Sequence, residues 1–165
     1  SGLVFLPGPT GRQSTLIDSP LGDLFPVSLD PQLPQGVLQR ENATFQLTEA
    51  GEQSSLTRLA DSPEANSRVW LNLPGFAWRA AVTRAKAGST PLVVHGQAAN
   101  AAGRIPLLVS QSFGAGKVLF MGIDSAWRWR KGVEDRYHYR FWSQVVRWMA
   151  YQRNMAAGET LRLYF

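Results

Sequence analysis

The chain has 165 residues, of which 44% are hydrophobic and 18% charged, and a formal net charge of +5 at pH 7. This composition is typical of one globular domain with its own core, and it excludes an intrinsically disordered chain. The absence of cysteine excludes disulfides, thiolate metal sites and cysteine nucleophiles. No apolar run approaches the roughly 18 residues that a membrane-spanning helix needs.

Charge is distributed unevenly along the chain. Residues 1–66 carry three Arg or Lys against eight Asp or Glu, and residues 67–165 carry fourteen against four, so the two parts have net charges of −5 and +10. A basic part of this kind is suited to an acidic partner, nucleic acid or a lipid surface. Because the cations are scattered along the sequence, we favour the interpretation that they complement the acidic part of this domain or of a neighbouring one.

The first half of the chain predicts short elements. The apolar run at residues 3–6 predicts a buried strand, because the Pro-Gly-Pro sequence that follows it forces a sharp exit. Residues 14–24 predict a short helix that Pro20 interrupts. We further expect an extended irregular connection over residues 25–36, an edge strand over 43–47, and helical turns over 56–59 and 64–71.

The second half predicts more regular structure. Strands are expected at residues 77–83, 91–95, 106–112 and 117–123, with a loop at 98–103. The turn at residues 113–116 contains two glycines and joins the last two strands into an antiparallel hairpin. We therefore expect a mixed sheet in which this hairpin lies against otherwise parallel strands.

One long helix is predicted over residues 135–150. At about 100° per residue, its aromatic and aliphatic side chains gather on one face and its arginines on the other, as in a helix packed on a sheet. Residues 161–165 then begin a further extended segment.

Most motifs that suggest chemistry have a structural explanation. The Gly-Ala-Gly-Lys sequence at residues 114–117 lacks the Ser or Thr and the helix that follow the lysine of a phosphate-binding loop, since Val118 and a strand come next. No Gly-x-Ser-x-Gly elbow is present for a Ser-His-Asp triad. His138 lies amid the apolar helix face, which favours a hydrogen-bonded core histidine. Glu134, one turn earlier, could share a metal ion with His138, but the spacing specifies no third ligand.

The sequence DSAWRWR, residues 124–130, is more informative. An acidic residue followed by Ser at the carboxyl end of a strand is placed to cap the next segment or to face a crevice. Trp and Arg then alternate, a spacing at which a guanidinium can stack on an indole. The structural interpretation, which we favour, is an Arg/Trp ladder that fixes the loop to the helix. The functional interpretation is a site for a carbohydrate, an anion or a peptide.

Nine segments of the chain together form a pattern that is similar to a known family. They are SQSFGAGKVLFMGIDS at residues 110–125, WRWR at 127–130, YH at 137–138, RFW at 140–142, QVVRW at 144–148 and NMAAGE at 154–159, with LVFLPG at 3–8, LGDLFPV at 21–27 and LTRL at 56–59. These segments resemble a bacterial family of class I glutamine amidotransferase-like domains, which occur in large membrane-anchored proteins of unassigned function. The resemblance implies a flavodoxin-like α/β fold: a three-layer sandwich around a mixed sheet with a C-terminal antiparallel hairpin.

The resemblance also implies a domain organisation. Residues 1–157 form a partial amidotransferase-like domain, and residues 158–165 begin a linker or strand that leads to a following domain. In the family an additional βα portion precedes the strand that matches residues 3–6. We therefore expect a fold that is incomplete at its N-terminus, or a sheet edge that a second chain covers.

The chemistry of the family does not carry over to this sequence. Amidotransferases use a cysteine on the elbow after a central strand and a histidine after a later strand, and this chain has no cysteine. The strand at 118–123 matches the one that precedes the family's histidine, but it ends in Asp124. Thiolate attack on glutamine is therefore excluded, and we expect no catalytic residue, no metal and no cofactor.

We expect a non-catalytic binding or scaffolding module of a larger bacterial envelope protein, on the periplasmic side. Its expected partners are the neighbouring domains of the parent protein, with a homodimer as another option, no nucleic acid, and membrane only through segments outside this chain. One alternative is a hydrolase that uses Asp124 with Glu134 or His138, with or without a metal ion. Another is a purely structural domain, expected if side chains fill the crevice at the strand ends. The binding surface is expected at Pro7, Gly8, Asp124, Ser125, Trp127, Arg128, Arg130 and His138.

Overall fold

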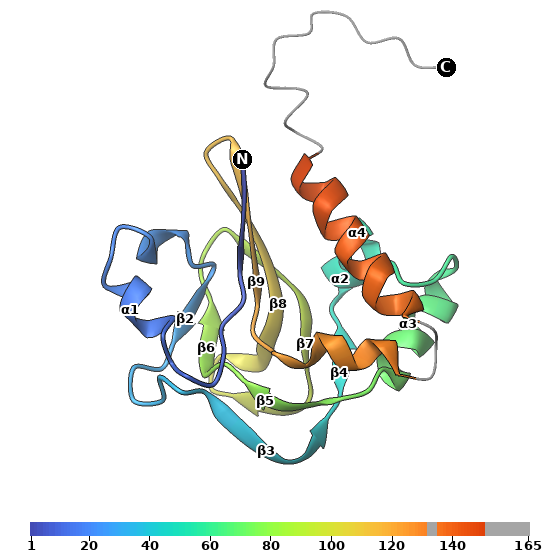
Figure 1. Cartoon of the computed structure of the whole chain (residues 1–165), viewed down its shortest axis with the longest axis horizontal. Helices are drawn as coiled ribbons and strands as arrows, with labels where there is room; N and C mark the ends of the chain where they lie inside the picture. The colour runs from blue at the N-terminus through green and yellow to red at the C-terminus, as the bar shows by residue number, and fades with distance from the viewer. Residues whose placement is uncertain (132–134, 151–165) are drawn as a thin grey trace, which may run out of the picture.

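A five-stranded sheet forms the centre of the molecule in the computed structural model, which describes residues 1–131 and 135–150 (Figure 1). The elements, with η for a 3-10 helix, are β1 Gly2–Phe5, α1 Ser14–Ile17, η1 Gly22–Leu24, β2 Val27–Leu29, β3 Val37–Ala43, β4 Phe45–Leu47, α2 Glu49–Gln53, η2 Ser55–Thr57, α3 Pro63–Asn72, β5 Phe76–Arg79, β6 Val82–Ala85, β7 Ser89–Asn100, β8 Gly103–Phe113, β9 Gly116–Met121, η3 Ser125–Arg130 and α4 Arg136–Ala150.

The central sheet has the strand order β1-β9-β8-β7-β4. β1 and β9 are parallel, whereas the β9–β8, β8–β7 and β7–β4 pairs are antiparallel. The predicted α/β class, the mixed sheet and the antiparallel β8–β9 hairpin are therefore confirmed, and β4 is an edge strand as predicted. The expectation of otherwise parallel strands is wrong, because β7 and β8 form a second long hairpin and β4 joins it antiparallel.

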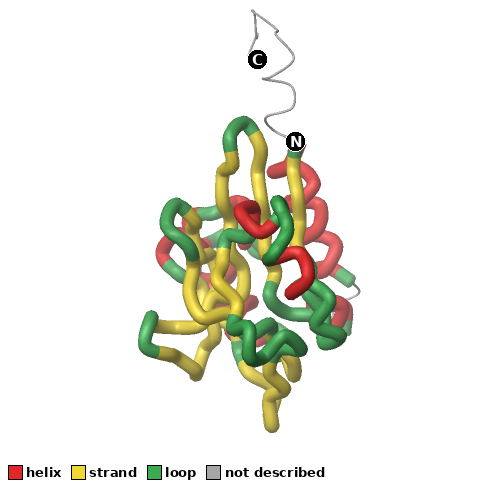
Figure 2. The backbone as a smooth tube through the Cα atoms, turned by 90° about the vertical axis from the view of Figure 1, so that its left-hand side faces the viewer, coloured by secondary structure: helices red, strands yellow, loops and turns green. Residues whose placement is uncertain are grey.

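Different elements cover the two faces of this sheet. Helices α2, α3 and α4 lie on one face, and β2, β6 and α1 lie on the other (Figure 1). Figure 2 views the sheet from the α1 side, with the strands in front of the long helix α4. The layer opposite the helices is thus built around a short antiparallel ribbon of β2 and β6.

Strand β9 shows why both faces of the sheet need a cover. Val118 and Phe120 belong to the core on the β2–β6 side, and Leu119 and Met121 belong to the core beneath the helices. A strand buried on both faces requires an uninterrupted apolar sequence, which these four residues supply.

The two longer helices follow the sequence pattern closely. α4 begins within one residue of the prediction, and Phe141 and Val145 of its apolar face are buried. α3 begins at Pro63, and Ser62 caps it, because the Ser62 hydroxyl oxygen accepts a hydrogen bond from the Ala65 N–H at 3.2 Å.

Three local predictions are wrong. The connection at residues 25–36 contains β2, which pairs with β6. The single strand predicted at 77–83 is divided at Ala80, whose N–H donates to Gly122 O at 2.8 Å, so that β5 pairs with β3 and β6 with β2. The predicted loop at 98–103 continues the β7–β8 hairpin, since Ala99 pairs with Arg104. The predicted boundary at residue 157, the segment 161–165 and Glu134 lie outside the described residues.

Candidate functional site

The carboxyl ends of β1 and β9 lie at the same end of the sheet because these two strands are parallel. The favoured interpretation of the sequence places a binding crevice here, and the alternative of a purely structural domain expects it to be filled. In the structure β5 lies against the exit of β9: Arg79 forms a β-bridge with Ile123 and Ala80 donates to Gly122. Part of the expected crevice is therefore occupied by β5 (Figure 1).

Asp124 and Ser125 follow β9 directly and pair with each other. The Ser125 hydroxyl donates to Asp124 Oδ1 at 2.8 Å, and Ser125 is buried whereas Asp124 is exposed. Asp124 occupies the cap position of η3, but its side chain accepts no capping hydrogen bond from that helix. The carboxylate thus fixes the Ser125 hydroxyl at the start of η3.

His138 forms a different local contact. Its Nδ1 lies 3.1 Å from the carbonyl oxygen of Ala126, so the ring fastens α4 to η3. Asp124 and His138 therefore have separate hydrogen-bond partners, and Glu134 lies outside the described residues. Within residues 1–131 and 135–150, no group of three or more His, Asp or Glu side chains is placed to hold a metal ion.

Trp127, Arg128 and Arg130 line a groove of about 600 Å³. We call it the Trp127 groove; its lining residues are Asn42, Pro74, Gly75, Trp127, Arg128, Arg130, Lys131 and Asp135. They come from four places in the chain: the end of β3, the α3–β5 connection, η3 with the residue after it, and the start of α4. The sequence run at 124–130 therefore supplies part of the groove, and distant segments complete it.

Arg128 is held by two hydrogen bonds and a ring contact. Its Nη1 donates to Asn42 Oδ1 at 3.1 Å and to Gly75 O at 3.4 Å. Its Cζ lies 5.8 Å from the ring centroid of Trp127, within cation–π range. Both oxygen acceptors are neutral, so they position the guanidinium without compensating its charge.

Arg130 and Asp135 form a two-point ion pair at the other end of the groove. Arg130 Nε lies 2.5 Å from Asp135 Oδ1, and Nη2 lies 3.2 Å from Oδ2. The hydrogen bond from Arg130 lowers the pKa of Asp135 below its usual value, and the same contact raises the pKa of Arg130. Asp135 has a left-handed backbone (φ +63°), a conformation that Asp and Asn adopt more readily than most residues.

Pro7 and Gly8 do not join the Trp127 groove. They line a separate cavity of about 690 Å³, which extends along β1 and the connection to α1 and shares no lining residue with the groove. The eight residues predicted as one surface are thus divided among the β1 cavity, the Asp124–Ser125 pair, the His138 contact and the Trp127 groove.

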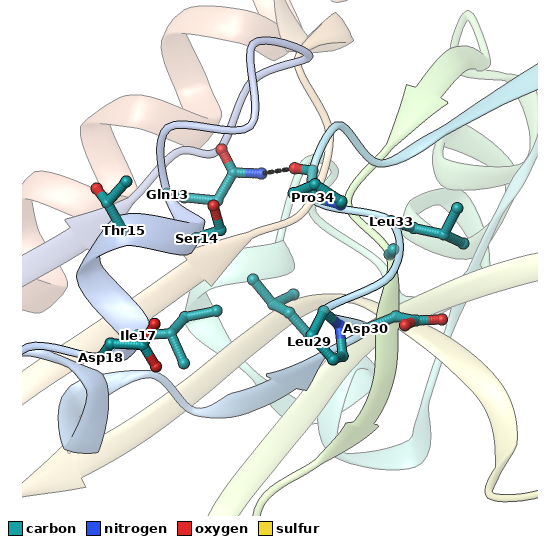
Figure 3. Close-up of a pocket in the computed structure, with 11 residues that line it drawn as sticks. Gln13, Ser14, Thr15, Ile17, Asp18, Leu29, Asp30, Leu33 and Pro34 are labelled. Atoms are coloured by element: carbon teal, nitrogen blue, oxygen red, sulfur yellow. Dashed lines mark hydrogen bonds between the residues drawn. The ribbon is translucent and has the colours of Figure 1, made fainter.

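A third cavity, of about 370 Å³, lies between α1 and the β2–β3 connection (Figure 3). Gln13 Nε2 donates to Pro34 O at 3.2 Å across it. Asp30, one of its two carboxylates, accepts a hydrogen bond from the Gln32 N–H at 2.9 Å, as in an Asx turn. This use of Asp30 is structural.

The sequence interpretation missed five lining residues of the groove: Asn42, Pro74, Gly75, Lys131 and Asp135. Lys131 and Asp135 adjoin the predicted run, so their proximity was the available signal. Asn42 and Gly75 carried no such signal, because they lie 86 and 53 residues away from Arg128 in the sequence.

His95 is a buried polar residue that no sequence pattern singled out. It is 2% exposed, and its Nδ1 accepts hydrogen bonds from the N–H groups of Gln97 (3.1 Å) and Ala98 (3.0 Å). The ring proton therefore resides on Nε2, which has no hydrogen-bond partner in the described part of the chain. Burial lowers the pKa of His95 below 6.5, and the nearby charges of Arg79 and Arg104 lower it further.

We expect the free energy of unfolding to fall as the pH is lowered from about 6.5 to 5. The unfolded chain takes up a proton at His95 near its ordinary pKa of 6.5, whereas the folded chain resists protonation, so the unfolded state binds more protons and stability declines by at most about 1.4 kcal/mol per pH unit. Urea titrations across this range measure the slope. His95→Gln is expected to flatten it, and an unchanged slope in that variant would contradict the assignment.

Comparison with known proteins finds solved structures with a similar fold, but it assigns the chain to no family. No family model matches the chain, and no curated protein matches it. Two solved structures are similar: cytoplasmic protein STM1381 from Salmonella typhimurium LT2, with a TM-score of 0.65 and 18% identity, and cytoplasmic protein STM3548 from Salmonella typhimurium, with a TM-score of 0.65 and 14% identity. Each alignment covers 90% of this chain and 55% of the other, so the chain spans about half the length of these proteins.

The predicted location is contradicted by this comparison. A place in the bacterial cell envelope was expected, but both structural neighbours are named as cytoplasmic proteins. None of the described helices is long and apolar enough to cross a membrane. At 14–18% identity the similarity itself concerns the fold alone.

Proposed function

We propose that this chain is a non-catalytic binding or scaffolding module of a larger bacterial protein, and that it binds its partner in the Trp127 groove. The observation that carries the proposal is the indole of Trp127, which is 63% exposed and lines a groove together with three cationic side chains. Large exposed aromatic side chains in a concave surface are typical of recognition sites.

For the fold class, we propose a catalytically degenerate domain of the class I glutamine amidotransferase-like type. The parallel β1–β9 pair and the helix α4 after β9 support this proposal, because they repeat the βα arrangement of a flavodoxin-like sheet. The absence of cysteine supports the loss of the family's chemistry. The antiparallel β7–β8 hairpin and the β2–β6 ribbon would then be departures from the family's usual fold.

Trp127→Ala tests the proposed function. We expect small-molecule fragments that bind the wild-type chain, detected by ligand-observed NMR, to lose at least about fivefold in affinity in this variant, because stacking on an aromatic side chain contributes about 1–3 kcal/mol. Folding is expected to remain intact because the indole is largely exposed.

Phe113→Ala provides the matched control. Phe113 is also a partly exposed aromatic residue (48%), but it lies at the β8–β9 turn and does not line the groove. The proposal predicts unchanged fragment binding in this variant. It is overturned if Trp127→Ala and Phe113→Ala behave alike, or if the fragments map to another surface.

A further inference from the structure

The charges of the Trp127 groove do not balance. Among the described residues that line it, three are cations (Arg128, Arg130 and Lys131) and one is a carboxylate (Asp135), so these residues have a net charge of +2. The ion pair between Arg130 and Asp135 neutralises both of its members. The excess charge therefore resides on Arg128 and Lys131.

Neither of these two cations meets an anion in the described part of the chain. Arg128 donates one nitrogen to the neutral oxygens of Asn42 and Gly75, which leaves the N–H groups on its other nitrogens available. Lys131 is exposed and forms no ion pair with a described residue. Two cations that line the same groove, one of them positioned by hydrogen bonds to neutral oxygens, form a surface suited to a phosphate or carboxylate.

The indole of Trp127 adds a second requirement. It lines the same groove and lies beside the Arg128 guanidinium, with 5.8 Å between Cζ and the ring centroid. A ligand that touches both groups must present an anionic group next to a flat ring, because the guanidinium selects the charge and the indole face selects a planar, weakly polar surface.

We infer that the Trp127 groove binds a small molecule in which a phosphate or carboxylate is attached to a planar ring. This inference rests on the proposed function, since it names the ligand class of the same groove. Arg128 and Lys131 bind the anionic group and Trp127 stacks on the ring. The Arg130–Asp135 pair limits the positive charge that the groove presents.

The test measures dissociation constants by NMR titration of the full chain with phenyl phosphate, benzoate, inorganic phosphate and phenol. Phenyl phosphate is expected to bind at least about fivefold more tightly than inorganic phosphate or phenol, because it engages both parts of the groove. Comparison of phenyl phosphate with benzoate distinguishes a phosphate site from a carboxylate site; tighter binding of either one supports the inference.

Three variants test the charges in opposite directions. Lys131→Gln and Arg128→Gln are each expected to weaken phenyl phosphate binding about fivefold or more. Asp135→Asn keeps a residue that tolerates the left-handed backbone, releases Arg130 and raises the net charge to +3, so it is expected to strengthen binding about threefold or more. Arg147→Gln, which removes an exposed cation of α4 outside the groove, is the control and should leave binding unchanged.

The results separate this inference from the proposed function. If phenol binds as tightly as phenyl phosphate and Trp127→Ala abolishes both, the groove is a binding site but the inferred ligand class is wrong. Equal affinities in Asp135→Asn, Lys131→Gln and the wild-type chain also overturn the inference, and so does binding of a single-stranded oligonucleotide without binding of phenyl phosphate. If Trp127→Ala has no effect on any ligand, both proposals fail. Because Lys131 is exposed and forms no ion pair with a described residue, Lys131→Gln remains informative even if Arg128→Gln does not fold.

Discussion

Replacing Trp129 by alanine is expected to lower the free energy of unfolding by about 3–5 kcal/mol, the usual cost of removing a buried aromatic side chain from a core. Trp129 is 1% exposed and packs edge-on against three rings. The centroid distances are 5.8 Å to Phe45, 5.5 Å to Trp70 and 5.3 Å to Phe141. Because these rings belong to β4, α3 and α4, the substitution removes a contact shared by the sheet and both longer helices. Urea unfolding followed by circular dichroism measures the change.

Trp127→Ala is the control for this prediction, because it removes the same side chain two positions away in η3. Trp127 is 63% exposed, so we expect a change within about 0.5 kcal/mol. Trp129→Phe should lower the free energy of unfolding less than Trp129→Ala does. It keeps a ring, and it removes an indole N–H that has no hydrogen-bond partner in the described part of the chain. If Trp127→Ala and Trp129→Ala lowered the free energy of unfolding by similar amounts, the placement of Trp127 on the surface and Trp129 in the core would be contradicted.

These two tryptophans also show what the sequence could reveal about the site. The alternation of Trp and Arg indicated a ladder or a binding surface, and the structure contains elements of both. Trp129 is buried, whereas Trp127 and Arg128 face the groove. In an extended segment a two-residue spacing would place both tryptophans on one side, whereas the 3-10 helix η3, with three residues per turn, directs them to different sides. The sequence does not indicate which of the two is buried. That choice depends on α4, which covers Trp129 through Phe141.

The fold was predictable where a pattern is long or its turn chemistry is specific. The helix α4 has fifteen residues of amphipathic sequence, and the two glycines at residues 113–116 determine the β8–β9 hairpin. The short strand β2 was missed because its pairing with β6 joins residues more than 50 positions apart. Long-range pairing of strands of three and four residues leaves no local period.

The sequence pattern also did not predict the contacts that the arginine face of α4 makes. The helical period correctly separates Arg140 and Gln144 from the apolar face, which suggests solvent exposure. In the structure both donate to the carbonyl oxygen of Arg58, and Arg140 also forms an ion pair with Asp61 at 2.7 Å. Periodicity identifies the face of a helix that enters the core, but it does not identify a loop that packs beside the polar face of the helix.

Gly51→Ala is expected to destabilise the fold by about 3 kcal/mol or more, although it adds only one methyl group. Gly51 lies in α2, a five-residue helix that the sequence did not predict, and it is buried against β7. A Cβ on Gly51 would overlap the carbonyl oxygen of Leu92. Because this obstacle is backbone within the central sheet, no side-chain rotation can relieve the overlap, and α2 must move away from β7.

The displacement would also disturb the hydrogen bonds that hold α2 in place. Thr48 caps the helix by accepting from the Gly51 N–H at 2.9 Å, and its hydroxyl donates to Pro91 O at 2.7 Å. Gly8→Ala is the matched control, because a Cβ at Gly8 meets no atom within 4 Å. There the same substitution should be neutral or stabilise the fold by up to about 1 kcal/mol through the unfolded state. Equal unfolding midpoints for Gly51→Ala and the wild-type chain would show that α2 does not pack on β7 at this distance.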